Sequence, residues 1–295
     1  MKRFIQKTGV INGAVLLLTL LILACIWLFP GLPGAYSWFI LKLVLPFAGL
    51  AGLLYQTVAL MLFKSRRKQP LKRAVSLIIY TLWTSCILLT VNVIPLAYPA
   101  SLTDSSPAAI IAWPFAEEAV IGWGGDSVED NMPHAIWPSE RWAYDIVMEP
   151  YGTGSRNPED YGVWNREVLS PAAGTVIAAY QDEPDLTPGE ENFQTMAGNH
   201  VYLRLDDSGT YLLLNHFKQG SITVQVGDHV KQGDLLGRVG NSGSSSEPHL
   251  HIHHQRQNPT KTLHPVLADG LPLYFRNSTD TFMPKKGTIL KQSND

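Results

Sequence analysis

The chain has 295 residues, enough for one sizeable domain and a further smaller part. Its net charge of -2 hides a division: residues 1–100 contain ten Lys or Arg and no acid, whereas residues 101–295 hold all 25 acidic residues and all nine histidines. The second part is acidic and lacks a basic aromatic surface, which argues against nucleic acid as a partner.

The first hundred residues contain three apolar runs, at about 10–29, 36–63 and 74–98. Each reaches the roughly 20 residues that cross a hydrocarbon core, so residues 1–100 are predicted to form a membrane region with three transmembrane helices. A secretory signal is the alternative for the first run. That run is too long for a signal, and no small-residue cleavage site follows it.

Three side chains inside these runs carry further expectations. Cys25 and Cys86 both fall within predicted spans and are interpreted as apolar residues rather than a disulfide pair. Lys42 is predicted to lie near a membrane interface, where its apolar stem lets the ammonium group reach water.

The basic residues predict an orientation. Lys2, Arg3 and Lys7 precede the first run, and six more Lys or Arg lie in residues 64–73 between the second and third runs. Basic loops favour the cytoplasmic side of a membrane. An odd number of spans then places the chain from residue 101 onward outside the cytoplasm, after a multi-pass membrane region.

The second part has the pattern of a mainly antiparallel β domain. Residues 101–126 are predicted to be a linker and entry segment, and residues 269–295 a C-terminal extension. Between them, short apolar stretches are bounded by Gly, Pro, Asn and Asp. The predicted elements are a strand–turn–strand at 168–180, a hairpin at 200–205 and 210–217, a surface loop at 182–192, and strands at 221–226, 234–239 and 249–255.

Four histidines lie within six residues at the end of this domain. His249, His251 and His253 alternate, so they share one face of a predicted strand. Imidazole is a common zinc ligand and a general acid or base near neutral pH. His254 and His229 are predicted to face solvent, and a histidine-rich surface strand without a function is the alternative for the whole run.

A catalytic zinc usually takes three protein ligands, so further partners are needed. Asp145 is a carboxylate in an apolar, strand-like stretch, where it is costly unless paired or bound to a cation. His134 precedes it by eleven residues across a predicted turn at 138–140, and His216 ends a predicted strand. The alternatives are a strand-end aspartate bonded to a turn, a loop histidine and an ordinary strand histidine, respectively.

Four segments in order resemble the lysostaphin/LytM-type zinc metallopeptidases, which are bacterial cell-wall endopeptidases. They are residues 170–176, Asn215-His216-Phe217, residues 226–237, and Asn241-Ser242-Gly243 followed by Pro248-His249-Leu250-His251. The resemblance covers about residues 127–268. It implies a β fold of the duplicated hybrid motif type, with Zn2+ as cofactor.

The resemblance also implies roles for individual residues. Asp145 and His251 correspond to zinc ligands, and His216 and His249 to the two catalytic histidines beside a zinc-activated water. The usual first histidine, four residues before the aspartate, is replaced by Arg141, which stays protonated and cannot bind zinc. His134 is therefore taken as the third ligand, as in family variants with an upstream histidine.

These observations support three hypotheses. The leading one is a membrane-anchored zinc endopeptidase that cuts peptidoglycan peptides, with the lipid bilayer and a membrane protein bound through the spans as partners. The second is a catalytically inactive domain of the same fold that scaffolds or activates another cell-wall hydrolase. The third is a metal-binding module of a transporter, which is disfavoured because the spans contain no acid or histidine.

Overall fold

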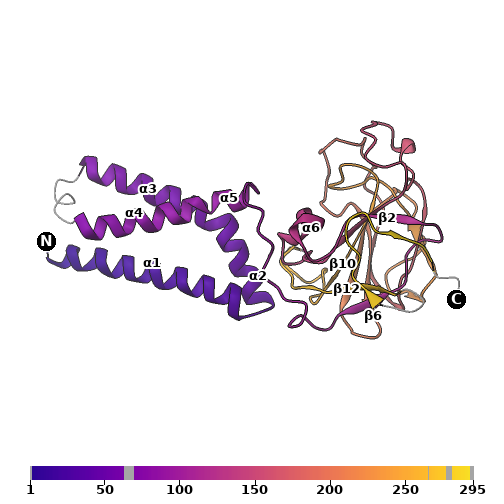
Figure 1. Ribbon diagram of the computed structural model, residues 1–295, viewed down its shortest axis with the longest axis horizontal. Helices are drawn as coiled ribbons and strands as arrows, with labels where there is room; N and C mark the ends of the chain where they lie inside the picture. Colours follow the sequence, from indigo (N-terminus) through magenta and orange to yellow (C-terminus); the bar gives the residue numbers. More distant parts are fainter. Residues whose placement is uncertain (1, 63–69, 265, 277–280, 293–295) are drawn as a thin grey trace. The chain divides into compact units, whose positions relative to one another are not determined.

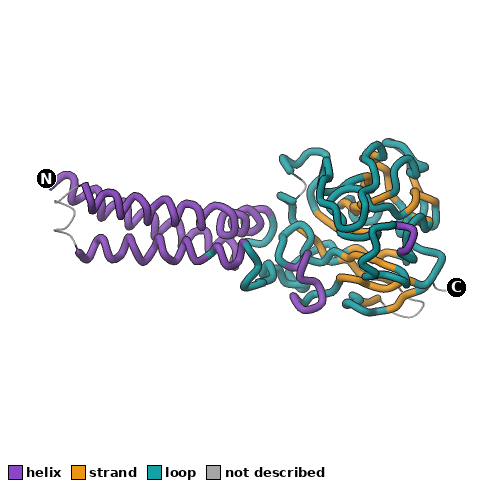
Figure 2. The backbone as a smooth tube through the Cα atoms, turned by 90° about the horizontal axis from the view of Figure 1, so that it is seen from above, coloured by secondary structure: helices purple, strands orange, loops and turns teal. Residues whose placement is uncertain are grey.

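The computed structural model of the chain describes residues 2–62, 70–264, 266–276 and 281–292. It divides into two compact units, Met1–Pro99 and Ala100–Asp295. The first unit is built of helices, and all the strands belong to the second (Figures 1 and 2). The part of the basic loop at residues 64–69 lies outside the described residues.

The helices of the first unit form three long apolar segments. They are α1 (Lys2–Leu28); the consecutive α2 (Leu32–Phe39), π-helix η1 (Ile40–Val44) and α3 (Leu45–Leu62); and α4 (Pro70–Ser85) with α5 (Ile87–Thr90). The stretches Val10–Leu28, Leu32–Leu62 and Pro70–Thr90 are long and apolar enough to cross a membrane. The predicted three-helix organisation is therefore confirmed, by length and composition.

Two details of these helices bear on the prediction. The third segment ends at Thr90, because Asn92 adopts a left-handed backbone (φ 55°) and Pro95 follows, so residues 91–98 are not helical. Lys42, predicted near an interface, lies in η1 with only 1% of its surface exposed. The unit itself covers this side chain, and its place near a membrane interface stays a prediction.

The second unit is built mainly on one large antiparallel sheet. Its order is β14-β2-β3-β10-β7-β6-β5-β8, with β11 also paired to β10; β1-β12-β13 and β4-β9 form smaller sheets. The strands are β1 (Ala109–Ile111), β2 (Ala119–Trp123), β3 (Tyr144–Val147), β4 (Glu167–Leu169), β5 (Gly174–Tyr180), β6 (Asn199–Leu205), β7 (Tyr211–Phe217), β8 (His229–Val230), β9 (Leu235–Arg238), β10 (Leu250–Gln255), β11 (Gly270–Leu271), β12 (Leu273–Arg276), β13 (Thr281–Phe282) and β14 (Ile289–Leu290). Helix α6 (Val128–Ala135) and the short 3-10 helix η3 (Pro158–Asp160) interrupt this series.

The core explains how β10 is oriented. Leu250 and Ile252 are buried in the main apolar cluster together with residues such as Leu214 of β7. Alternation along the strand then turns His251 and His253 to the other face of the sheet. The apolar residues of β10 thus fix which face of the sheet carries the histidines.

The segments at both ends of the second unit belong to its sheets. Within residues 101–126, predicted as a linker, β1 pairs with β12 and β2 pairs with β3. In the predicted C-terminal extension, β11 pairs with β10 and β14 pairs with β2. Strands of two to five residues are too short to show a clear alternation in the sequence.

The other predicted strands have mixed outcomes. The hairpin of β6 and β7 is confirmed, with Gly209 in the left-handed conformation of its turn (φ 68°). The strand–turn–strand at 168–180 is confirmed as β4 and β5, which pair with other strands: β4 with β9, and β5 with β6 and β8. Residues 221–226 form no strand, although Thr223 N donates a hydrogen bond to Leu236 O (3.0 Å).

Candidate metal centre

Neighbouring strands bring two of the predicted ligands together. In the antiparallel pair β3–β10, Asp145 and His251 are direct register partners, although 106 residues separate them. Their side chains lie on the same face, with His251 Nδ1 at 2.9 Å from Asp145 Oδ1. The pairing of β3 with β10 therefore brings together two side chains that lie far apart in the sequence.

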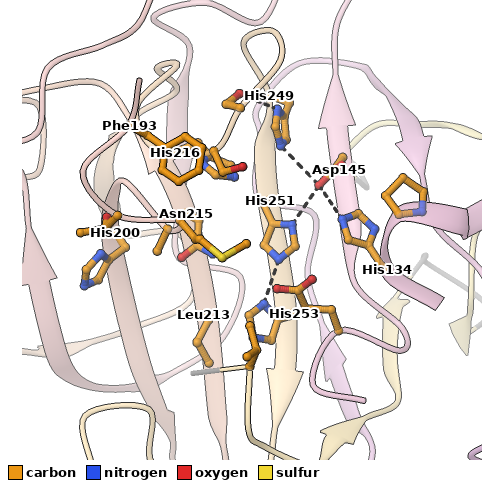
Figure 3. Close-up of a pocket in the computed structure, with 18 of the residues that line it drawn as sticks. His134, Asp145, Phe193, His200, Leu213, Asn215, His216, His249, His251 and His253 are labelled. Carbon is orange, nitrogen blue, oxygen red and sulfur yellow. Dashed lines mark hydrogen bonds and ion pairs between the residues drawn. The ribbon is translucent and has the colours of Figure 1, made fainter. Parts of the chain in front are cut away.

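Helix α6 supplies the third predicted ligand. Ser127 caps the N-terminus of this helix, because its hydroxyl oxygen accepts a hydrogen bond from Asp130 N (3.0 Å), and His134 lies in the last turn. His134 Nε2 lies 3.3 Å from Asp145 Oδ1. One ligand atom from each of His134, Asp145 and His251 lies within 4.8 Å of the others, and Figure 3 shows the three side chains converging.

His249 and His216 stand beside this group. His249 Nε2 lies 3.4 Å from Asp145 Oδ1, and one nitrogen of each of His216, His249 and His251 lies within 4.8 Å of the others. The structure thus gathers the other four predicted site residues around Asp145 (Figure 3).

His216 reaches the site through a β-bulge. The pairing of β6 with β7 skips it, because Asn199 is opposite Phe217 and His200 is opposite Asn215. Its backbone is left-handed (φ 66°), a conformation uncommon for a side chain with a Cβ and frequent near functional sites. Both Asn215 and His216 consequently line the same groove, which strict alternation would forbid.

The hydrogen bond of His134 determines which of its nitrogens is free. Asn131 is buried, and its Nδ2 donates to Gly125 O and Ala143 O (both 3.1 Å). Its Oδ1 must then accept from His134 Nδ1–H at 2.8 Å. The lone pair of His134 is left on Nε2, the atom that faces Asp145.

The two predicted catalytic histidines are oriented in the same way by backbone carbonyls. His216 Nδ1 donates to Ser242 O and His249 Nδ1 donates to Glu247 O, each at 2.8 Å. A carbonyl oxygen only accepts, so both imidazoles, when neutral, keep their lone pair on Nε2. The two carbonyls are orienting partners that the resemblance does not imply, and the role of Asn131 as the acceptor for His134 emerges only from the structure, where its backbone departs from helical geometry (φ -144°, ψ 36°).

The electrostatics of the cluster centre on Asp145. Burial would raise the pKa of its carboxyl, but the charges and hydrogen bonds of His134 and His249 hold it well below its usual range. Burial likewise lowers the pKa of His134 and His249, and the Asp145 carboxylate more than offsets this, so both pKa values lie above the ordinary one. The metal-free site therefore favours an ionised carboxylate and attracts positive charge.

His216 and His253 behave differently. Burial, followed by the charge of neighbouring histidines, lowers the pKa of both imidazoles well below the ordinary value, so they are neutral. Two imidazoles and a carboxylate with their lone pairs directed to one place are a donor set that suits zinc. The residues present fit that cation.

Four further residues of this unit take other positions. Arg141 is buried and pairs with Asp126 (2.9 Å). His229 is exposed, as predicted, and pairs with Asp206 (2.7 Å). The prediction for His254 is wrong: it is buried on the core side of β10, because this central strand is covered on both faces. His200 donates from Nδ1 to Gly198 O (2.8 Å) and stacks on Tyr202.

The cluster lies in an open groove of about 1120 Å³. One wall includes the segment from Phe193 to Ala197. Glu183, predicted in a surface loop, is instead buried beneath this wall. Its carboxylate accepts hydrogen bonds from Gln194 N (2.8 Å), Thr195 N (3.2 Å) and Thr195 Oγ1 (2.8 Å). A groove of this volume is large enough to take a short peptide segment.

The second unit is similar in sequence and structure to known peptidases. Residues 160–263 match Peptidase family M23, a stretch that includes His216, His249 and His251 and begins after His134 and Asp145. Among solved structures, the antimicrobial peptidase lysostaphin from Staphylococcus simulans matches with 18% identity over 52% of this chain and 46% of that chain (TM-score 0.32). A putative peptidase M23 from Pseudomonas aeruginosa matches with 19% identity over 50% and 47% (TM-score 0.28), and a SpoIIIAH and SpoIIQ complex with 17% identity over 51% and 97% (TM-score 0.34). The chain spans less than half the length of the first two.

Proposed function

Because the second unit carries a LytM-type domain of Peptidase family M23, we propose that the protein is a zinc-dependent endopeptidase that hydrolyses peptide bonds of peptidoglycan. The observation that carries the proposal is the convergence of His134 Nε2, Asp145 Oδ1 and His251 Nδ1. These three residues would hold the cation. The domain proposed to act is residues 127–268.

When bound there, zinc would supply a Lewis acid that polarises a carbonyl and lowers the pKa of a water. The proton transfers then fall to His216 and His249. Each donates its Nδ1–H to a carbonyl and keeps a lone pair on Nε2, so each is able to accept a proton from the attacking water and return it to the leaving amine. Asp145 would be held by the metal, and a second carboxylate, that of Glu140, lies on the side of His251 and His253.

Zinc content and cleavage of the purified full chain in detergent test this function. His251→Ala is expected to lose both zinc and the release of peptides from peptidoglycan. His249→Ala is expected to keep zinc and lose roughly 100- to 10,000-fold in rate. His229→Ala, at the exposed pair with Asp206, is the matched control that keeps both. Cleavage by His251→Ala at the wild-type rate would sink the proposal.

One observation favours a second candidate, a catalytically inactive scaffold or activator of another cell-wall hydrolase. Arg141 stands where the usual first histidine is found, and it is engaged with Asp126 rather than with Asp145. This candidate predicts that a strain carrying His249→Ala keeps normal wall growth. If that strain has normal protein levels but defective wall growth, the result supports the enzyme and contradicts the scaffold.

We also propose that the protein lies in a bacterial cell membrane, with its N-terminus in the cytoplasm and the second unit outside. The three apolar segments and the distribution of basic residues support this arrangement. In a chain with Cys25 and Cys86 replaced by Ser, a cysteine placed at Ser105 should react with a membrane-impermeant maleimide in intact cells. Labelling only after lysis would contradict it.

The same spans support a proposal about partners. They contact the lipid bilayer, and they offer a surface for another membrane protein that a single anchor would not provide. Crosslinking from exposed positions such as Leu54 tests this, with peptidoglycan peptides remaining the substrate of the second unit.

A further inference from the structure

We propose that His253 is a positioning residue that holds His251 in the one tautomer able to bind a metal. It does so through a chain of hydrogen bonds that ends at a backbone carbonyl. The inference rests on the proposed function only in taking zinc as the cation. Nothing in the motif that carries the resemblance extends to His253.

The chain of hydrogen bonds follows one face of β10. His251 Nε2 lies 2.9 Å from His253 Nδ1, as the dashed line in Figure 3 shows, and His253 Nε2 lies 3.3 Å from Gln255 Oε1. Gln255 Nε2 then donates to Gln257 O at 2.7 Å. Alternate residues of a strand share a face, so the spacing of the three side chains builds this row directly. All three side chains are buried, although His251 and His253 also line the groove.

The Gln257 carbonyl at the end of this row of hydrogen bonds determines which atom donates at each step. Gln257 O only accepts, so Gln255 turns its amide NH2 toward it and its Oε1 toward His253. His253 must therefore donate from Nε2. A neutral imidazole has one N–H, so His253 Nδ1 is an acceptor, and His251 must donate to it from Nε2. The lone pair of His251 is left on Nδ1, the atom 2.9 Å from Asp145 Oδ1.

Asp145 favours the other tautomer of His251. Without a cation, its carboxylate favours a proton on His251 Nδ1, and that tautomer has no lone pair at the site. It would require His253 to donate from Nδ1 and to set its Nε2 lone pair against Gln255 Oε1. If the Gln255 amide were flipped, its NH2 group would satisfy His253 Nε2, but its Oε1 would then face the carbonyl oxygen of Gln257. Two buried acceptors then face each other within the row of hydrogen bonds, just as His251 Nδ1 and Asp145 Oδ1 face each other in the first tautomer, and a cation at the site relieves the conflict only in the first tautomer.

Two substitutions at His253 separate hydrogen bonding from packing. His253→Asn places an amide oxygen near the position of Nδ1 and keeps an acceptor for His251. His253→Leu fills similar space without an acceptor. Outer partners of metal-bound histidines typically contribute about 10- to 100-fold in affinity. Zinc affinity is therefore expected to fall by about 10- to 100-fold in His253→Leu and by much less in His253→Asn, measured on the full chain in detergent by competition with a chelating dye.

A second measurement needs neither zinc nor activity. In the metal-free full chain with 15N-labelled histidine rings, correlation spectra report which ring nitrogen carries the proton. The share of His251 that is protonated on Nε2 is expected to be similar in the wild type and in His253→Asn, and to fall in favour of Nδ1 in His253→Leu. This shift distinguishes positioning from a loss of packing, which would not move the proton.

Several outcomes would overturn the inference. One is a folded His253→Leu chain with wild-type zinc affinity and an unchanged tautomer. Another is an equal loss in the Asn and Leu variants. A third is a second zinc per chain that is lost in Glu140→Gln, because a cation among Glu140, His251 and His253 would replace the proton on Nε2. A chain that binds zinc but cleaves nothing would overturn the proposed function instead, and leave the tautomer result standing.

Discussion

His254 is expected to make the second unit sensitive to acid. It occupies the core side of β10 with 1% of its surface exposed. Its Nδ1 donates to Pro272 O (3.1 Å), and its Nε2 accepts from the Thr210 hydroxyl (2.6 Å). Burial is the main reason that its pKa is lowered to about 4; the Pro272 carbonyl opposes this, and the charge of Arg256 adds to it.

The size and sign of the effect follow from this value. An unfolded histidine has a pKa of about 6.5, so the difference of about 2.5 pKa units corresponds to about 3 kcal/mol. Between pH 6.5 and pH 4 the unfolded chain binds a proton that the folded chain does not. The contribution of His254 to the free energy of unfolding is therefore full above pH 6.5 and is lost as the pH falls toward 4.

The variant His254→Leu removes the titrating group and keeps an apolar side chain in the core. Urea unfolding of the second unit, followed by pulse proteolysis of the full chain in detergent, gives the free energy of unfolding at each pH. Between neutral pH and pH 4 the wild type should lose about 3 kcal/mol more than the variant, whatever their difference at neutral pH. Equal losses in the two proteins would refute the burial argument.

Three further predictions concern the site. Asn131→Leu should weaken zinc binding by about 10- to 100-fold, because His134 loses the acceptor for its Nδ1–H, whereas Asn131→Asp keeps an acceptor; chelator competition on the two variants checks this. Glu183→Gln should destabilise the groove wall locally by about 2 kcal/mol, because a charged acceptor of three hydrogen bonds is lost, and amide exchange at Gln194 and Thr195 should quicken while β10 is unaffected. Removing zinc by chelation should lower the free energy of unfolding of the second unit by about 2.7 kcal/mol relative to zinc at a hundred times its dissociation constant; no shift in the urea midpoint would speak against a site in the folded state.

The sequence was informative wherever the signal is local. Hydropathy predicted the three apolar helical segments, because an uninterrupted run of the right length needs no tertiary context. Alternation predicted that His249 and His251 share a face. Asp145 stood out because it is an acid within an apolar, strand-like stretch. Three of the site's side chains thus follow from strand geometry together with the resemblance.

Other features depend on pairing that no single segment contains. His216 reaches the groove through a bulge between β6 and β7, which strand periodicity does not predict. His254 is buried because β10 is a central strand with both faces covered, and alternation alone cannot distinguish solvent from a second packed layer. The edge pairing of β14 with β2 involves too few residues to leave a pattern, so residues 101–126 and 269–295 resembled connections.

The direct pairing of Asp145 with His251 has a consequence for folding of the sheet. A slip of one residue between β3 and β10 would set Leu250 or Ile252 opposite Asp145 and turn the alternating histidines toward the core. The metal-facing atoms of His134, Asp145 and His251 therefore come together in only one register of the two strands. A cation that binds them would favour that register over its neighbours by its own binding free energy, and would so stabilise the correct alignment of the two strands.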